Sequence, residues 1–183
     1  MCGIVGSINT DWINNPLDSI SHRGPDFQES INIKNVYLGH TRLSIQDLSS
    51  LGNQPMQSSD GRFTLVYNGE IYNHWQLREN LIKKGYTFNS KSDTETLLNS
   101  WREWGKDAIK YLNGIFAFSI LDKNENKLYI VRDRFGVKPL YVYQKNDSFA
   151  FSSEIKALIN IKGFDPLINY ESIVNYLTFL WSP

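Results

Sequence analysis

Cysteine is almost absent from this sequence, which has one residue of this type, Cys2, among its 183. A single cysteine excludes an internal disulfide framework and fits a reducing compartment. A dominant charge is also absent, because 19 basic residues balance 19 acidic ones. Neither a nucleic acid nor an anionic membrane is therefore an expected partner. No apolar run approaches the roughly 18 residues of a membrane helix, and no signal peptide opens the chain. We expect a soluble cytoplasmic protein.

Histidine is scarce as well, with only His22, His40 and His74. Together with one cysteine, these scattered residues give no spacing typical of a metal site, so we expect no metal. A Cys–His pair is nevertheless the commoner way to activate a thiol. A pairing of one of these histidines with Cys2 therefore stays open as a second hypothesis.

Aromatic residues are abundant at 14% of the chain, which suits a core built from β-sheets. Residues 2–8, 35–40 and 63–67 read as strands, and four more strand-like runs follow from residue 115. Short polar turns separate these later runs, a spacing typical of antiparallel hairpins. Several runs are apolar on both faces, which indicates stacked sheets flanked by helices, an α+β fold.

A first helix is predicted after Asn73, which has the side chain of an N-cap residue. Leu77, Leu81 and Ile82 would form its buried face, and Gly85 would end it.

A second helix is predicted after Ser92, which together with Glu95 has the spacing of a capping box. Leu97, Leu98 and Trp101 would form its buried face.

The position of the single cysteine has a chemical consequence. If Met1 were removed, Cys2 would carry a free α-amino group beside its thiol, so one residue would hold a nucleophile and a candidate base. The simpler interpretation is a small buried side chain with no catalytic role. Position alone favours the simpler interpretation, and other motifs must decide.

Motifs along nearly the whole chain resemble, in order, those of one family. They are MCGIVG (1–6), HRGPD (22–26), GHTRLSI (39–45), NQPM (53–56), YNGEIYN (67–73), SDTE (92–95), NGIFAF (113–118), RDRFGVKPLY (132–141) and SSEIKAL (152–158). The family is the glutaminase domain of glutamine-hydrolysing asparagine synthetases, which are class II glutamine amidotransferases and N-terminal-nucleophile hydrolases. The resemblance implies a four-layer αββα sandwich of two antiparallel sheets.

The resemblance also implies roles for individual residues. Cys2 would be the nucleophile, and Asn68 with Gly69 would bind the oxyanion. Arg42 would bind the carboxylate of the substrate, and Asp93, supplemented by Glu70, its ammonium group. Backbone groups of Leu43, Ser44, Ile45 and Gln46 would line the same pocket.

Some of these residues also have structural interpretations. Asn68–Gly69 could be an ordinary hairpin turn, and Asp93 would be favoured at a helix N-terminus in any case. Arg23 could be structural or could belong to a loop that closes over bound glutamine.

The resemblance assigns residues 1–165 to the glutaminase domain. Residues 166–183 would form a C-terminal helix, which either caps the core or begins a linker to a synthetase domain. Its apolar residues Tyr170, Ile173, Val174, Leu177 and Trp181 lie at helical spacing and would line an interface. The segment before HRGPD is short for this family, so one outer helix is expected to be reduced to a turn.

The implied activity is hydrolysis of L-glutamine to L-glutamate and ammonia through a Cys2 thioester. The ammonia would serve an ATP-dependent synthetase domain, placed C-terminal to this chain or acting in trans, and a homodimer is compatible with the family. The glutaminase domain would need no cofactor, since ATP and Mg²⁺ belong to the synthetase domain, whose pyrophosphate-binding loop is absent here.

Three alternatives stay open at this point. The domain could sense glutamine without turnover, could feed ammonia to another acceptor such as a sugar carboxylate, or could hydrolyse a different amide. Arg42 together with Asp93 favours an amino-acid substrate, because only such a substrate needs both charges.

Overall fold

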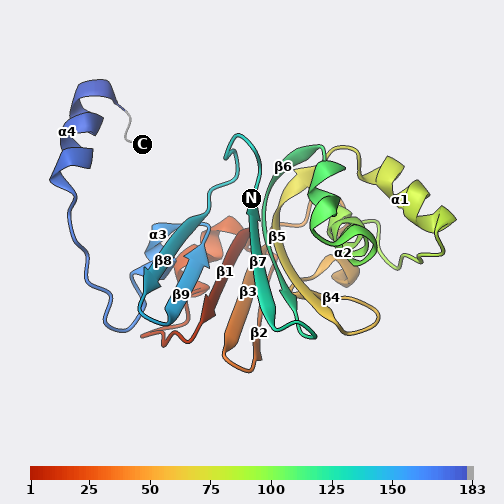
Figure 1. Cartoon of the computed structure of the whole chain (residues 1–183), viewed down its shortest axis with the longest axis horizontal. Helices are drawn as coiled ribbons and strands as arrows, with labels where there is room; N and C mark the ends of the chain where they lie inside the picture. Colours follow the sequence, from red (N-terminus) through yellow and green to blue (C-terminus); the bar gives the residue numbers. More distant parts are fainter. Residues whose placement is uncertain (181–183) are drawn as a thin grey trace.

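Two antiparallel sheets face each other in the computed structural model, which describes residues 1–180 (Figure 1). One sheet has five strands, in the spatial order β2 (Phe27–Ile33), β3 (Val36–Arg42), β1 (Gly3–Ile8), β9 (Ser148–Ser152) and β8 (Tyr141–Lys145). The other has four, in the order β4 (Met56–Gln57), β5 (Phe63–Ile71), β6 (Gly114–Asp122) and β7 (Lys127–Arg132).

Helices cover the outer face of each sheet. On the four-stranded sheet lies α2 (Asp93–Trp104), with α1 (His74–Lys83) packed on it and the 3₁₀ helix η3 (Gly105–Lys110) following it. The five-stranded sheet is covered by the 3₁₀ helix η1 (Asp18–Arg23) and the short α3 (Ile155–Leu158). The fold is therefore the predicted four-layer αββα sandwich of two antiparallel sheets (Figure 1).

Strand β5 shows why both faces of a central strand are apolar. Phe63, Leu65 and Tyr67 point to the helical layer and pack with Leu97 of α2, whereas Val66 packs between the sheets. Side chains alternate across a strand, so a strand covered on both faces needs apolar residues at successive positions. The prediction of doubly covered sheets is confirmed.

The strands differ from the prediction in three places, and one of them is β4, which was not predicted because two residues give no alternating pattern. Strand β2, at the edge of its sheet, was not predicted, because its sequence FQESINI is mostly polar and largely exposed. Strand β5 continues to Ile71 and pairs Asn68 with Ala117 and Gly69 with Phe116. The interpretation of Asn68–Gly69 as a hairpin turn is therefore wrong.

The first predicted helix exists, but two details of the prediction are wrong. The side chain of Asn73 does not cap α1; its Nδ2 donates to Tyr111 O at 2.9 Å and its Oδ1 accepts from Asn113 N at 3.0 Å. Ile82 is 54% exposed, because α1 packs on α2 rather than on a sheet and so buries only a narrow face.

The second predicted helix begins at its expected cap, since Ser92 Oγ accepts from Thr94 N at 3.1 Å. The capping box does not close, however. The N–H of Ser92 donates to Ser90 Oγ, and the Glu95 carboxylate instead accepts from the N–H groups of Asn89 and Ser90. Glu95 therefore fixes the loop before the helix.

The six-residue 3₁₀ helix η1, which ends on His22 and Arg23 of HRGPD, is the only helix between β1 and β2, in line with the expected reduction of an outer helix.

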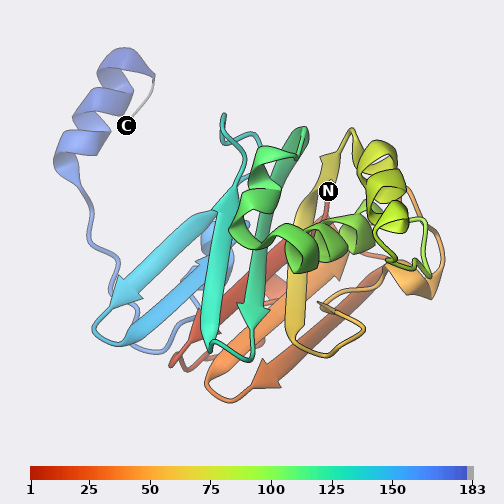
Figure 2. The same cartoon turned by 45° about the vertical axis from the view of Figure 1, so that its right-hand side comes forward.

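The C-terminal helix α4 (Tyr170–Phe179) stands away from the sandwich in two views (Figures 1 and 2). It has no buried residue, and Leu177 is 73% exposed. It therefore does not cap the core. Trp181, which was assigned to its apolar stripe, lies outside the described residues. Within residues 1–180, no helix is long and apolar enough to cross a membrane.

Candidate active site

A cavity of about 100 Å³ opens where β1, β3 and β5 approach the start of α2. It is lined by Met1, Cys2, Arg42, Leu43, Ile45, Gln46, Asp47, Gly52, Gln54, Tyr67, Asn68, Gly69, Glu70, Ser92, Asp93, Thr94 and Lys138. All but one of the residues proposed from the sequence are among them. The exception is Ser44, whose N–H donates to Asp26 Oδ2 at 2.7 Å.

Cys2 lies at the head of β1, next to the end of β3. Its Sγ is 3.4 Å from the N–H of Leu43, which donates to it, and 3.6 Å from the Leu43 carbonyl. Burial raises the pKa of the Cys2 thiol, whereas the Leu43 N–H and the positive charges of the chain's amino end and Arg42 oppose this shift. The thiol is thus placed beside a donor that can stabilise its anion.

Arg23 holds the backbone of Cys2. Its Nε donates to Cys2 O at 3.0 Å, and its Nη1 donates to Glu154 Oε1 at 3.0 Å. Arg23 does not line the cavity, and its two hydrogen bonds fit a structural role for this residue.

A backbone donor faces the cavity from β5. The N–H of Tyr67 donates to Gln54 Oε1 at 2.6 Å, and the N–H of Ile71 donates to Asp93 Oδ2 at 3.0 Å. Alternate residues of a strand present their N–H groups to the same side, so the N–H of Gly69 points to this same edge. The cavity borders Gly69, and the loop and turn hydrogen bonds within residues 1–180 do not use its N–H.

The partner strand agrees with this direction. Phe116, which faces Gly69 on β6, uses its own backbone groups toward Asp133, donating to Oδ2 at 3.2 Å and accepting from N at 2.7 Å. Residue pairs of an antiparallel ladder alternate between bonded and non-bonded, so Gly69 and Phe116 form a non-bonded pair.

Glycine is needed at position 69 for a steric reason. A Cβ there would lie 2.5 Å from Ile115 O and 2.8 Å from Phe116 Cα. The close approach of β6 therefore requires glycine at this position.

Asn68 supplies a second donor beside the first. The residue is 2% exposed, and its buried Nδ2 has no hydrogen-bond partner within the described residues. A buried donor without an acceptor costs about 1–3 kcal/mol, which an incoming oxygen would recover. Two donors side by side are an arrangement that can bind an oxyanion.

Arg42 is buried and held by the loop that follows β3. Its Nη1 donates to Ser49 O and Asn53 Oδ1, both at 2.7 Å, and its Nη2 donates to Asp47 O. These bonds use three of the five guanidinium N–H groups. The Nε–H and one N–H of Nη2 are left for another acceptor, and a carboxylate is the anion that suits a guanidinium best.

Asp93 is the first residue of α2 and lies 5% exposed in the cavity wall. Its Oδ2 accepts from Tyr67 Oη at 2.6 Å and from Ile71 N at 3.0 Å. Burial raises the pKa of this carboxyl, although both hydrogen bonds oppose the shift. Its Oδ1 has no hydrogen bond within residues 1–180, so a cation is the ligand that this position favours.

Two of the three histidines have hydrogen-bond partners away from Cys2. His40 is fully buried, burial lowers its pKa to about 3, and its Nε2 lies 3.2 Å from Tyr67 O. His22 is bonded to Glu154, and burial lowers the pKa of His74. No hydrogen bond joins a histidine to Cys2 within residues 1–180, so the second hypothesis, a Cys–His pair, gains no support.

Sequence reasoning did not single out several residues of the cavity. Gln54, Tyr67 and Lys138 were visible only as members of motifs, since nothing in their local pattern distinguishes a cavity residue from a core residue. The hydrogen bonds of Gln54 and Tyr67 hold β5 in place beside the cavity.

Residues 1–183 match a family model described as a glutamine amidotransferase domain. The chain is 41% identical over 193 residues to the glutamine-hydrolysing asparagine synthetase 1 of Bacillus subtilis, a match covering 100% of this chain and 30% of that protein. It is 40% identical over 167 residues to asparagine synthetase 3 of Arabidopsis thaliana, covering 86% and 28%. The chain thus spans less than a third of the length of these relatives.

Among solved structures, the glutamine phosphoribosylpyrophosphate amidotransferase of B. subtilis matches with a TM-score of 0.72 and 23% identity. The match covers 87% of this chain and 43% of that one. At this identity the likeness concerns the fold.

Proposed function

The chain belongs to the glutamine amidotransferase domain family, and from this membership we propose that it hydrolyses L-glutamine to L-glutamate and ammonia through a thioester on Cys2. The observation that carries the proposal is one cavity in which the Cys2 thiol, the donors of Asn68 and Gly69, the Arg42 guanidinium and the Asp93 carboxylate meet. An amide substrate with a zwitterionic end would use all of these groups.

Binding would use the two opposite charges. The α-carboxylate of glutamine takes the free N–H groups of Arg42, and its α-ammonium takes Asp93 with Glu70 beside it. Because both protein charges are held by other hydrogen bonds before the substrate arrives, little ordering is left to occur on binding. The side-chain amide then extends toward Cys2.

The first chemical step forms the thioester. The Cys2 sulfur attacks the amide carbon, and the carbonyl oxygen becomes an oxyanion that accepts hydrogen bonds from Asn68 Nδ2 and Gly69 N–H. The Cys2 α-amine takes the thiol proton and returns it to the departing nitrogen, so ammonia leaves as the C–N bond breaks.

The second step hydrolyses the thioester. The same amine removes a proton from water, the hydroxide adds to the acyl carbon within the same pair of donors, and the C–S bond breaks to give glutamate and the thiol. Both steps share one oxyanion site, so weakening it slows both.

Maturation follows from this scheme. Met1 precedes Cys2 and forms part of the cavity wall, and a peptide nitrogen is not a base. Removal of Met1 would both free the amine and widen the cavity.

The ammonia acceptor lies beyond this chain. By analogy with its relatives, we propose that the ammonia supports ATP- and Mg²⁺-dependent amidation of aspartate, in a synthetase domain C-terminal to this chain or in trans. The glutaminase step itself would need no cofactor. A free thiol nucleophile suits the reducing cytoplasm, which is the location we propose.

The test uses the chain with Met1 removed, verified by intact mass. Equal yields of glutamate and ammonia from glutamine are expected, together with a glutamyl adduct in acid-quenched samples. Cys2→Ala should lose both the activity and the adduct while its melting temperature is retained. Turnover by Cys2→Ala at the parent rate would exclude the thioester.

A further inference from the structure

Lys138 is a charged residue of the cavity that the chemistry above leaves unused. It is only 8% exposed, although lysine is rarely buried, and it lines the same cavity as Cys2. It follows β7 in the loop that leads to β8.

The backbone of Lys138 is fixed on both sides. Its N–H donates to Asp133 Oδ2 at 2.9 Å, and its carbonyl accepts from Arg132 Nε at 2.7 Å. Asp133 also accepts from the N–H of Val137. The lysine is therefore built into the cavity wall rather than attached to a free loop.

The ammonium group has a poor partner. Its Nζ lies 3.0 Å from Met1 Sδ, and a thioether is only a weak acceptor. None of the ion pairs within residues 1–180 includes Lys138. Loss of Met1 would remove this contact and leave the α-amine of Cys2 as the end of the chain in the same cavity.

We propose that the Lys138 ammonium controls the protonation state of Cys2 once Met1 has been removed. The thiol and the α-ammonium group of Cys2 then hold two protons that can be lost, and the positive charge of Lys138 favours loss of the first. The inference rests on the proposed function, because it needs Met1 removed. The proton can leave from sulfur or from nitrogen, and the two products are forms of one protonation state. A nearby positive charge favours the loss in either case, so more of the enzyme is reactive at neutral pH.

Other charged groups lie around Cys2, and they differ from Lys138 in having hydrogen-bond partners of their own; Arg42 and Asp93 also influence the pKa of its thiol. They are Arg42 on β3, Asp47 on the following loop, Glu70 on β5, Asp93 on α2, and the pair of Arg23 with Glu154 behind the Cys2 backbone. Bound glutamine would neutralise Arg42 and Asp93 with its own charges. Lys138 would then be the cationic side chain of the cavity still without a counter-charge, so its influence persists in the complex.

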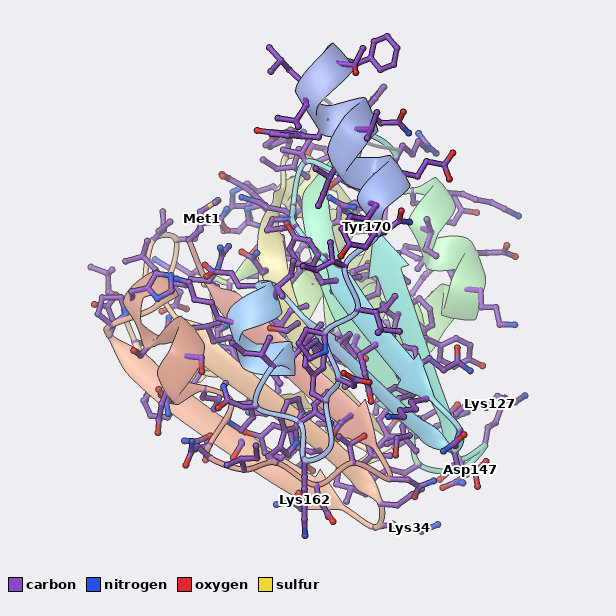
Figure 3. The ribbon with its side chains drawn as sticks, turned by 90° about the vertical axis from the view of Figure 1, so that its left-hand side faces the viewer. Met1, Lys34, Lys127, Asp147, Lys162 and Tyr170 are labelled. Atoms are coloured by element: carbon purple, nitrogen blue, oxygen red, sulfur yellow. The ribbon has the colours of Figure 1, made fainter. Side chains whose placement is uncertain are left out.

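The experiment measures kcat/KM for glutamine against pH in the mature enzyme and in three variants. Lys138→Met removes the charge at similar size, and Lys138→Arg keeps it. Lys162→Met makes the same charge change at an exposed position, at the end of the molecule opposite Met1 (Figure 3).

For Lys138→Met, the acid limb of the kcat/KM profile should shift to higher pH by about half a pH unit to one pH unit. Near pH 6 this corresponds to a loss of about 3- to 10-fold that is recovered in alkaline buffer. Lys138→Arg and Lys162→Met should follow the parent. The pH midpoint of Cys2 alkylation by iodoacetamide, measured without glutamine, should move in the same direction.

A Lys138→Met profile parallel to that of the parent at every pH, with an unmoved alkylation midpoint, would overturn the inference and leave the proposed function intact. A parent enzyme without glutaminase activity would overturn the proposed function, and the alkylation midpoint would still decide this inference. If Lys138→Met does not fold, Lys138→Gln takes its place with the same expected results.

Discussion

Replacement of Asp93 by Asn separates a binding role from a structural one. Asn keeps an oxygen that can accept from Tyr67 Oη and Ile71 N, the two donors now 2.6 and 3.0 Å from Oδ2. What disappears is the negative charge opposite the α-ammonium of glutamine. Losing one partner of a buried charge pair costs about 2–3 kcal/mol when a neutral acceptor stays, so KM should rise about 30- to 150-fold.

The raised pKa of Asp93 predicts how glutamine affinity changes with pH. Burial raises the pKa of Asp93, and only its ionised form can pair with an ammonium group. Glutamine affinity should therefore fall as pH decreases through this raised pKa. In Asp93→Asn this fall in glutamine affinity at low pH should be absent, because an asparagine side chain does not titrate.

Stability should respond in the opposite direction. A carboxyl whose pKa is raised in the folded state stabilises the fold most below its unfolded pKa, and it costs stability once pH passes the folded value. At neutral pH the buried charge is thus a cost, and Asp93→Asn should melt at the same temperature as the parent or higher. Lost affinity with retained or gained stability is typical of a functional residue.

Two measurements check this prediction: the melting temperature by calorimetry, and the dissociation constant of glutamine by titration of the Cys2→Ala protein with and without Asp93→Asn. The titration isolates binding from turnover. An unchanged dissociation constant with a lower melting temperature would refute the binding role. It would show that Asp93 acts only at the N-terminus of α2, where an acidic residue contributes about 0.3–1 kcal/mol.

Three further predictions concern the chemistry. Asn68→Ala should lower kcat about 10²- to 10³-fold with little change in KM, because its donor acts on the oxyanion; steady-state kinetics with the reverse pattern would exchange its role with that of Arg42. Protein that retains Met1 should be inactive, and N-terminal sequencing of fully active protein that found Met1 in place would refute the amine as base. Addition of ATP and aspartate to this chain should leave glutamate and ammonia as the products, and asparagine detected by chromatography would contradict this.

The sequence alone determined the elements whose signals are local. Alternating and continuous apolar runs predicted most strands, and the cap at Ser92 predicted the start of α2. The motifs also singled out Cys2, Arg42 and Asp93, which line one cavity, because a family resemblance records residue types together with their order. Such signals depend on neighbours in the chain, and these are visible without a structure.

Only the tertiary structure decided what depends on residues far apart in the chain. The need for glycine at position 69 comes from the close approach of β6. The side chain of Asn73 does not cap α1, because it bonds to Tyr111 in the loop beyond α2. Lys138 resembles any lysine of a polar loop until the two sheets bring it beside Met1 and Cys2. Steric contacts and electrostatic energies depend on distances in space. The separation of two residues along the sequence does not give that distance.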